Sequence, residues 1–171
     1  MKSKSFSFLK KKLSLLVIII GISLFTIISC GKVMITGRSQ VLLFSQGELT
    51  SLSEQAYTEL MSKSEPSVNR SHINMVKKVG QDLTQAVERY VKQNGWEKAL
   101  EGITWKFDVV KSDQVNAFCL PNGNIVFYEG IMKITNTPDL VAVVMGHEIA
   151  HALAKHGNER MSQEVLVGAA G

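Results

Sequence analysis

The sequence predicts an α+β fold, and three observations lead to this prediction. Residues 47–63 and 72–93 carry apolar side chains at helical spacing. Residues 103–128 instead contain alternating apolar and polar side chains, with a turn signal among them, as paired strands do. Residues 138–157 form a third helical stretch that is largely apolar. With 171 residues, of which 45% are hydrophobic, the chain can form the core of one domain.

The positive charge of the chain lies at its N-terminus. There are 19 Lys and Arg residues against 15 Asp and Glu, a net charge of +4, but five of the lysines precede residue 30. Residues 31–171 therefore contain 14 basic and 15 acidic residues and carry a net charge of −1. A domain that binds nucleic acid would need a basic surface to contact phosphates. The sequence therefore predicts no nucleic-acid partner.

Residues 1–29 have the pattern of a targeting segment. A basic stretch through Lys12 is followed by an apolar run at 13–28 and then by Cys30. Residues 27–30, Ile-Ile-Ser-Cys, resemble the lipobox of bacterial lipoproteins, in which the Cys is lipidated. The resemblance implies a cleaved signal peptide and a lipid-anchored, periplasm-facing protein of the bacterial cell envelope, at the outer membrane. An uncleaved transmembrane anchor is the alternative, although the apolar run is short for a span.

The chain has two cysteines, Cys30 and Cys119. With Cys30 acylated, no intramolecular disulfide can form, so the domain depends on its core for stability. Cys119 lies in a predicted strand, where a cysteine usually acts as a small buried apolar side chain. Because a thiolate also suits zinc, a role for Cys119 as a metal ligand is kept as an alternative.

A short apolar segment follows Cys30 and ends at Ser45, which has Glu48 three residues later, the pattern of a capping box. These two residues predict the start of a helix that continues to about Lys63. We assign residues 30–66 to a lipidated N-terminus together with this first helix. Residues 67–171 are assigned to the main domain.

The second predicted helix, residues 72–93, is amphipathic, and Gly95 ends it. Its apolar side chains recur every three or four residues and its charged side chains face away, so we interpret it as a scaffold helix. His72 at its start is expected to be a solvated residue and not a ligand. In the strand region at 103–128, the pair Asn-Gly at 122–123 lies between two apolar runs and predicts a β-hairpin.

Residues 147–151 have the sequence His-Glu-Ile-Ala-His. They lie in the apolar helix that follows Thr137 and Pro138, a capping residue and a suitable first helical residue. Four residues turn a helix by about 400°, so His147 and His151 lie about 40° apart on one face. Two imidazoles in this arrangement can bind one zinc ion.

Glu148 lies about 100° from His147 around the helix, at the flank of the histidine face. From there it can reach a water molecule on the metal without binding the metal itself. Zinc lowers the pKa of such a water to about 7, and Glu148 would take its proton as the water attacks a carbonyl. The alternative is a structural role for two core histidines and a paired glutamate, which are costly to bury without a ligand. The pattern favours a hydrolase with one Zn²⁺ per chain.

Three segments together resemble a known family. They are Thr-Gly-Arg-Ser-Gln at 36–40, Val-Asn-Ala-Phe-Cys-Leu-Pro-Asn-Gly at 115–123, and Gly-His-Glu-Ile-Ala-His-Ala-Leu-Ala-Lys-His-Gly at 146–157. In this order they are similar to the HtpX-like zinc metallopeptidases, metallopeptidase family forty-eight, in the periplasmic lipoprotein branch of BepA and LoiP. The resemblance implies a zincin-like metallopeptidase core of the gluzincin type, with an active-site helix packed on a small β-sheet.

The resemblance also implies roles for individual residues. His147 and His151 would be zinc ligands, Glu148 the general base, and the strand at Asn116 and Ala117 the edge on which an extended peptide lies. Strand addition of this kind binds the peptide backbone and tolerates many sequences. The implied function is a zinc-dependent endopeptidase of the cell envelope that acts on misfolded or membrane-associated proteins. Expected partners are unfolded or extended polypeptides, the membrane and the outer-membrane assembly machinery.

In this family the third zinc ligand is a Glu on a later helix, and no residue here matches it. Glu159 and Glu164 are the only glutamates after residue 151, and neither lies in a ligand motif. His156 follows His147 by about 900° of helix and would face the opposite side, so we expect a packing or hydrogen-bonding role. We therefore expect residues 67–171 to be a C-terminally truncated metallopeptidase domain that binds zinc weakly and is a poor or inactive peptidase.

Two other classes of function stay open. The first is an envelope chaperone or assembly factor that uses a metallopeptidase fold with little or no proteolysis. It predicts that Glu148→Gln abolishes proteolysis but leaves a protective function. The second is an interaction module without metal, for which His147→Ala would change neither metal content nor stability.

Overall fold

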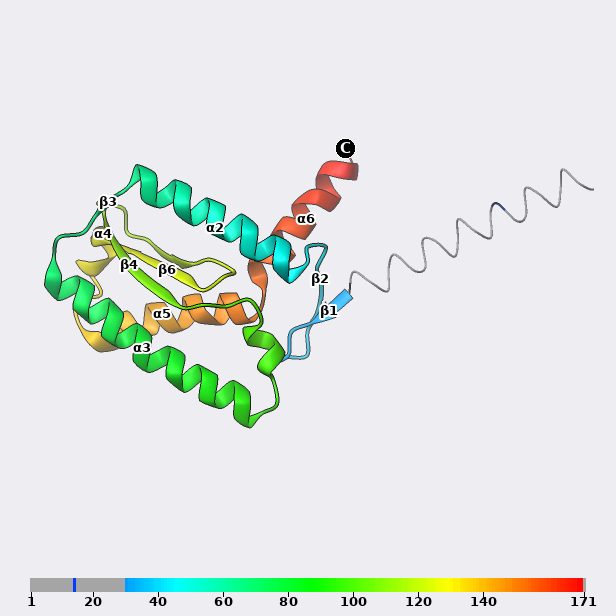
Figure 1. Ribbon diagram of the computed structural model, residues 1–171, viewed down its shortest axis with the longest axis horizontal. Coiled ribbons are helices and arrows are strands. Elements are labelled where there is room, and N and C mark those ends of the chain that lie inside the picture. Colours follow the sequence, from blue (N-terminus) through cyan, green and yellow to red (C-terminus); the bar gives the residue numbers. More distant parts are fainter. Residues whose placement is uncertain (1–13, 15–29, 171) are drawn as a thin grey trace, which may run out of the picture.

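The computed structural model describes residue 14 and residues 30–170. The proposed signal peptide comprises residues 1–29, and all of these except residue 14 lie outside the described residues. In the part of the chain that the structure describes, no helix is long and apolar enough to cross a membrane. Strands β1 (Cys30–Lys32) and β2 (Ser39–Val41) form an antiparallel hairpin at the side of the molecule (Figure 1). The elements that follow are α2 (Gln46–Lys63), β3 (Glu65–Pro66), α3 (Arg70–Gln93), the 3-10 helix η1 (Glu97–Leu100), β4 (Lys106–Lys111), β5 (Ala117–Cys119), β6 (Asn124–Tyr128), α4 (Glu129–Met132), α5 (Pro138–Leu153) and α6 (His156–Ala170).

The second sheet has the strand order β3-β4-β6-β5. Strands β4 and β6 are parallel, whereas β5 pairs antiparallel with β6 and forms one edge of the sheet. The predicted hairpin is confirmed, because residues 120–123 connect β5 directly to β6. Gly123 in this connection has φ of +90°, a conformation that glycine adopts without steric cost.

Helices cover both faces of this sheet. Side chains alternate between the two faces of a strand. Ile125 and Phe127 belong to the main core, which they form with α3 and α5, whereas Val126 is fully buried on the other face. On that other face, Tyr57 of α2 donates a hydrogen bond to Asp108 of β4 (2.8 Å). Figure 1 shows α2 on one side of the sheet and α3 and α5 on the other. The predicted α+β fold class is confirmed.

The N-termini of two helices confirm the predicted caps. At the start of α2, the Ser45 hydroxyl accepts a hydrogen bond from the Glu48 N–H (3.3 Å), and the Ser45 N–H donates to the Glu48 carboxylate (2.8 Å). At the start of α5, the Thr137 hydroxyl accepts from the Leu140 N–H (3.3 Å), and Pro138 is the first helical residue. The sequence pattern was therefore sufficient to locate the beginning of the helix that carries the candidate site.

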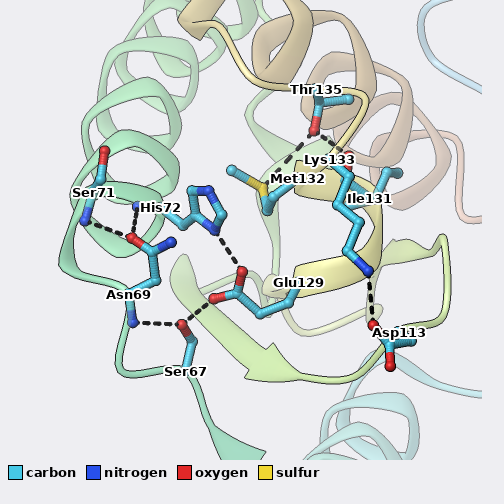
Figure 2. Close-up of polar contacts among 10 residues, drawn as sticks. All are labelled: Ser67, Asn69, Ser71, His72, Asp113, Glu129, Ile131, Met132, Lys133 and Thr135. Carbon is cyan, nitrogen blue, oxygen red and sulfur yellow. Dashed lines mark hydrogen bonds and ion pairs between the residues drawn. The ribbon is translucent and has the colours of Figure 1, made fainter.

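The expectation that His72 is solvated is wrong. Helix α3 begins at Arg70, because the side chain of Asn69 caps it and accepts a hydrogen bond from the His72 N–H (3.3 Å). The His72 ring then lies against α4, with Nδ1 2.5 Å from Oε2 of Glu129. The Ser67 hydroxyl donates to the other oxygen of Glu129 (Figure 2). The Glu129 carboxylate therefore joins α4 to the start of α3 and to the loop that precedes it.

The third predicted helix is two helices, contrary to the expectation of one that ends near Gly157. Helix α5 ends at Leu153, and α6 begins at His156. Between them Lys155 has φ of +56°, in the left-handed region that interrupts a right-handed helix. No Pro lies at this break, and the nearest Gly, Gly157, is already inside α6. The direction of the chain therefore changes immediately after the His-Glu-Ile-Ala-His segment.

The change Glu129→Gln is expected to lower the free energy of unfolding by about 1–3 kcal/mol, because a half-buried carboxylate loses its charge beside two partners. The matched control is Glu59→Gln, which changes an exposed carboxylate 2.6 Å from Lys63 and is expected to cost less than about 1 kcal/mol. Urea denaturation of both variants at one pH measures the difference. Equal losses of stability in the two variants would contradict the role given to Glu129.

Candidate metal centre

Helix α5 presents His147 and His151 on one face. Their ring centroids are 4.5 Å apart, and their Nε2 atoms are separated by 2.9 Å. The His147 side chain is exposed and that of His151 is half-buried. One ring nitrogen of each residue is therefore directed at a common point. Two neutral imidazoles in this arrangement fit two of the protein ligand positions of a zinc ion.

Glu148 borders a cavity of about 640 Å³ on one side of the histidine pair. The walls of this cavity are residues 118–121, at the edge of the sheet, together with residues of α5 and α6 that include His151. His147 borders a second cavity, of about 420 Å³, whose other wall is the turn between β1 and β2. His151 borders both cavities, whereas Glu148 borders only the first and His147 only the second.

Of the two predicted peptide-binding residues, Ala117 is the first residue of the edge strand β5 and Asn116 directly precedes it. The Asn116 carbonyl accepts a hydrogen bond from the Tyr128 N–H (3.1 Å), and the Leu120 N–H also bonds to β6. In an antiparallel pair, every second residue makes such bonds. Ala117 therefore turns its backbone N–H and C=O away from β6 toward the open edge, while its methyl group is buried in the core. The side chain of Asn116 is exposed.

Cys119 lies beside this site, and both its burial and the nearby Glu148 carboxylate raise the pKa of its thiol to about 12. A thiol with this pKa is protonated at neutral pH, whereas zinc binds the thiolate. The surroundings of Cys119 therefore favour a role as a partly buried apolar side chain.

His156 lies at the site too, although the sequence led us to expect it on the opposite side of the helix. That expectation assumed a continuous helix, whereas α5 ends at Leu153. The Nδ1 atoms of His156 and His151 are 2.7 Å apart, and the two rings meet edge to face. This contact is made by the His151 nitrogen that the His147 contact leaves free.

Among residues 30–170, no group of three or more His, Cys, Asp and Glu side chains is arranged to hold a metal ion. Glu159 is engaged elsewhere, in a bidentate ion pair with Arg38 at 2.6 and 2.5 Å. The guanidinium hydrogen bonds keep the pKa of Glu159 below its ordinary value. Glu164 is exposed on α6. Sequence reasoning placed Arg38 in the 36–40 segment but did not pair it with Glu159, because no spacing pattern connects two residues so far apart in the chain.

The comparisons with known proteins agree with this geometry. The model of peptidase family M48 matches residues 77–170, more than half of the chain. The chain belongs to peptidase family M48. The resemblance drawn from the three sequence segments is therefore confirmed at the level of the family, and M48 peptidases are metal-dependent.

The M48 chain has similar proteins in mitochondria and in bacteria. It is 44% identical over 66 residues to the mitochondrial metalloendopeptidase OMA1 of Arabidopsis thaliana, covering 39% of this chain and 14% of that protein. It is 27% identical over 146 residues to OMA1 of Saccharomyces cerevisiae, covering 84% and 42%. It is 32% identical over 50 residues to the beta-barrel assembly-enhancing protease of Escherichia coli, covering 29% and 10%. The M48 chain thus spans less than half the length of these curated relatives.

The environment of Cys119 makes a prediction for alkylation. In a Cys30→Ser background, iodoacetamide at about pH 8 is expected to modify Cys119 of the native chain at least about tenfold more slowly than in the urea-unfolded chain, because little thiolate is present in the fold. Mass spectrometry of quenched samples gives both rates. If the native chain were labelled as fast as the unfolded chain, the raised pKa of Cys119 would be contradicted. Cys119 would then again be a candidate metal ligand.

Proposed function

We propose that this M48 chain contains the catalytic core of a zinc-dependent endopeptidase of the bacterial cell envelope. The observation that carries the proposal is the convergence of the His147 and His151 Nε2 atoms, 2.9 Å apart, with Glu148 on the adjacent cavity wall. Membership of family M48 supports a metallopeptidase activity. The proposal adds the metal, the cellular compartment and the class of substrate.

His147 and His151 would hold the zinc ion through Nε2, since these two atoms converge. When bound, zinc would polarise the scissile carbonyl and lower the pKa of a water molecule to about 7. The chain itself contributes the Glu148 carboxylate, which would accept a proton from the attacking water and deliver it to the nitrogen of the leaving amine. Its position on the cavity wall, one residue after His147, suits a proton carrier that is not a ligand.

The open edge of the sheet supports a polypeptide as substrate. An extended peptide could pair with the outward N–H and C=O of Ala117 and reach the wall that carries Glu148, because residues 118–121 border the same cavity. Recognition would then depend on the peptide backbone, with Asn116 beside it and little dependence on side chains. Misfolded proteins expose such extended segments, so we propose unfolded or membrane-associated polypeptides as the substrate class.

The bacterial relatives support the envelope as the compartment. The beta-barrel assembly-enhancing proteases of Yersinia pestis and Escherichia coli are 33% and 32% identical to this chain over 58 and 50 residues. We propose that the chain is held at the outer membrane, facing the periplasm, by a lipid on Cys30, the first residue of β1. The outer-membrane assembly machinery is a proposed partner on the same basis.

Replacing Glu148 and His147 tests the reaction. Among residues 30–170 no third ligand joins the histidine pair, so the hydrolysis of an unfolded protein substrate by the parent chain is expected to be slow. Glu148→Gln is expected to keep the zinc content of the parent chain but to lower this slow hydrolysis by at least about 100-fold, because it removes the proton acceptor. His147→Ala is expected to lose the zinc as well. Elemental analysis and a casein cleavage assay measure the two effects.

The matched control for this test is Glu164→Gln, which changes an exposed carboxylate on α6 and is expected to alter neither quantity. Zinc content unaffected by His147→Ala would refute the proposed function, and so would cleavage unaffected by Glu148→Gln.

Replacing Cys30 tests the anchor. The parent chain, expressed in a bacterium with its first 29 residues, is expected to incorporate a palmitate analogue and to sediment with the membranes. The Cys30→Ser variant is expected to lose the label, whereas Cys119→Ser should keep it. Equal labelling of the parent and of Cys30→Ser would rule out lipidation at Cys30.

A further inference from the structure

The imidazole of His151 is held at both of its nitrogens. Its Nε2 lies 2.9 Å from Nε2 of His147, and its Nδ1 lies 2.7 Å from Nδ1 of His156. The three rings therefore form a row in which His151 is the middle member. The proposed reaction gives roles to His147 and His151 but none to His156.

The placement of His156 depends on the break between α5 and α6. Lys155, with φ of +56°, turns the chain so that the first residue of α6 faces back toward the last turn of α5. Had α5 continued, residue 156 would lie about 140° around the helix from His151, and the two rings would not meet. The contact is therefore a product of this backbone turn and not of helical spacing.

Helix α6 is fixed in this orientation by buried polar contacts with the segment that follows β2. The Asn158 side chain donates to the Phe44 carbonyl (2.8 Å), and the Ser162 hydroxyl accepts from the Leu43 N–H (2.8 Å). The Ser162 hydroxyl also donates to Asn158 (3.0 Å), and both side chains are almost completely buried. The start of α6 is therefore held firmly enough to position a side chain.

The ion pair between Arg38 and Glu159 is a second contact that holds α6 against the N-terminal hairpin. Glu159 lies one turn after His156 on α6, and Arg38 belongs to the turn between β1 and β2. The same turn forms a wall of the cavity that His147, His151 and His156 border. The segment after Cys30 therefore contacts α6 at three residues within the first two turns of that helix, all of them after His156.

We propose that His156 is a positioning residue that accepts a hydrogen bond from the Nδ1–H of His151 and so directs the lone pair of His151 Nε2 toward the metal position. This inference rests on the proposed function, because it takes His147 and His151 as the ligands. A neutral imidazole carries one N–H, so a proton held on Nδ1 leaves Nε2 free to bind. A partner of this kind usually fixes the ring orientation and tautomer of a metal-binding histidine.

His156 does not serve as the third ligand in this arrangement. Its contact is with Nδ1 of His151, whereas the common point of the histidine pair lies at Nε2. A ligand and a positioning residue differ in what their replacement does. Loss of a ligand removes the metal, while loss of a positioning residue weakens binding and is repaired by another hydrogen-bond acceptor at the same place.

Two substitutions at His156 separate these roles. His156→Leu removes the acceptor and is expected to weaken the affinity of the chain for Co²⁺ and Zn²⁺ by about 10- to 100-fold. His156→Asn can place a side-chain oxygen near the position of Nδ1 and is expected to retain affinity within about threefold of the parent. Competition with a chromophoric chelator gives the affinities, and the Co²⁺ absorption spectrum reports the ligand set. His72→Asn, which changes a histidine bonded to Glu129, is the control and is expected to leave the metal affinity unchanged.

The outcomes distinguish this inference from the proposed function. Metal binding by the parent that His147→Ala does not weaken would refute the proposed function. Binding that depends on His147 but is the same in His156→Leu as in the parent would refute the inference alone. A loss in both His156 variants as complete as in His147→Ala, with a changed Co²⁺ spectrum, would make His156 a ligand and overturn its positioning role.

The tautomer of His151 can be measured in the parent chain without metal, and a variant is needed only to assign the signal. Nitrogen NMR of the parent chain, with His151 assigned by comparison with His151→Gln, reports which ring nitrogen carries the proton. We expect the proton on Nδ1, together with a hydrogen-bond coupling to His156. A proton on Nε2 of neutral His151 would overturn the inference whatever the metal affinities are.

Discussion

The candidate site depends on one row of buried side chains along α5. Val141, Met145, Ile149 and Leu153 recur at four-residue spacing, and all four are buried in the main core. This row fixes the rotation of the helix about its axis. Residue 147 lies halfway between 145 and 149, about 200° from either, so the core that holds the row also exposes His147. Glu148, next to Ile149, is thereby placed at the boundary between core and cavity.

The sequence was informative for several interactions that are local. The capping box of Ser45 and Glu48, the Asn-Gly turn before β6 and the four-residue spacing of the histidine pair all connect residues within a few positions of one another. Local backbone geometry and side chains a few positions apart decide these features, so the sequence pattern is sufficient to predict them. The α+β class follows from them, because the helical and strand periods are each set within short segments.

The contacts that could not be predicted connect distant segments. Glu129 is 57 residues from His72, and Glu159 is 121 residues from Arg38. Neither pair follows from spacing, since only the packed fold brings the partners together. The break at Lys155 was missed for a different reason: the residue is neither Gly nor Pro, so no sequence signal marks its left-handed backbone. The error in the placement of His156 follows directly from that missed break.

The hairpin at the N-terminus has a consequence for where the protein could work. Strand β1 begins at Cys30 itself and pairs with β2, so within residues 30–41 there is no long unpaired linker between the proposed lipid and the folded domain. Arg38, eight residues later, already contacts α6, and eight residues span at most about 28 Å when fully extended. A lipid at Cys30 would therefore limit the distance between the bilayer surface and the three histidines, His147, His151 and His156. Proximity to the membrane, more than the sequence at the cleaved bond, would then decide which polypeptides are cut.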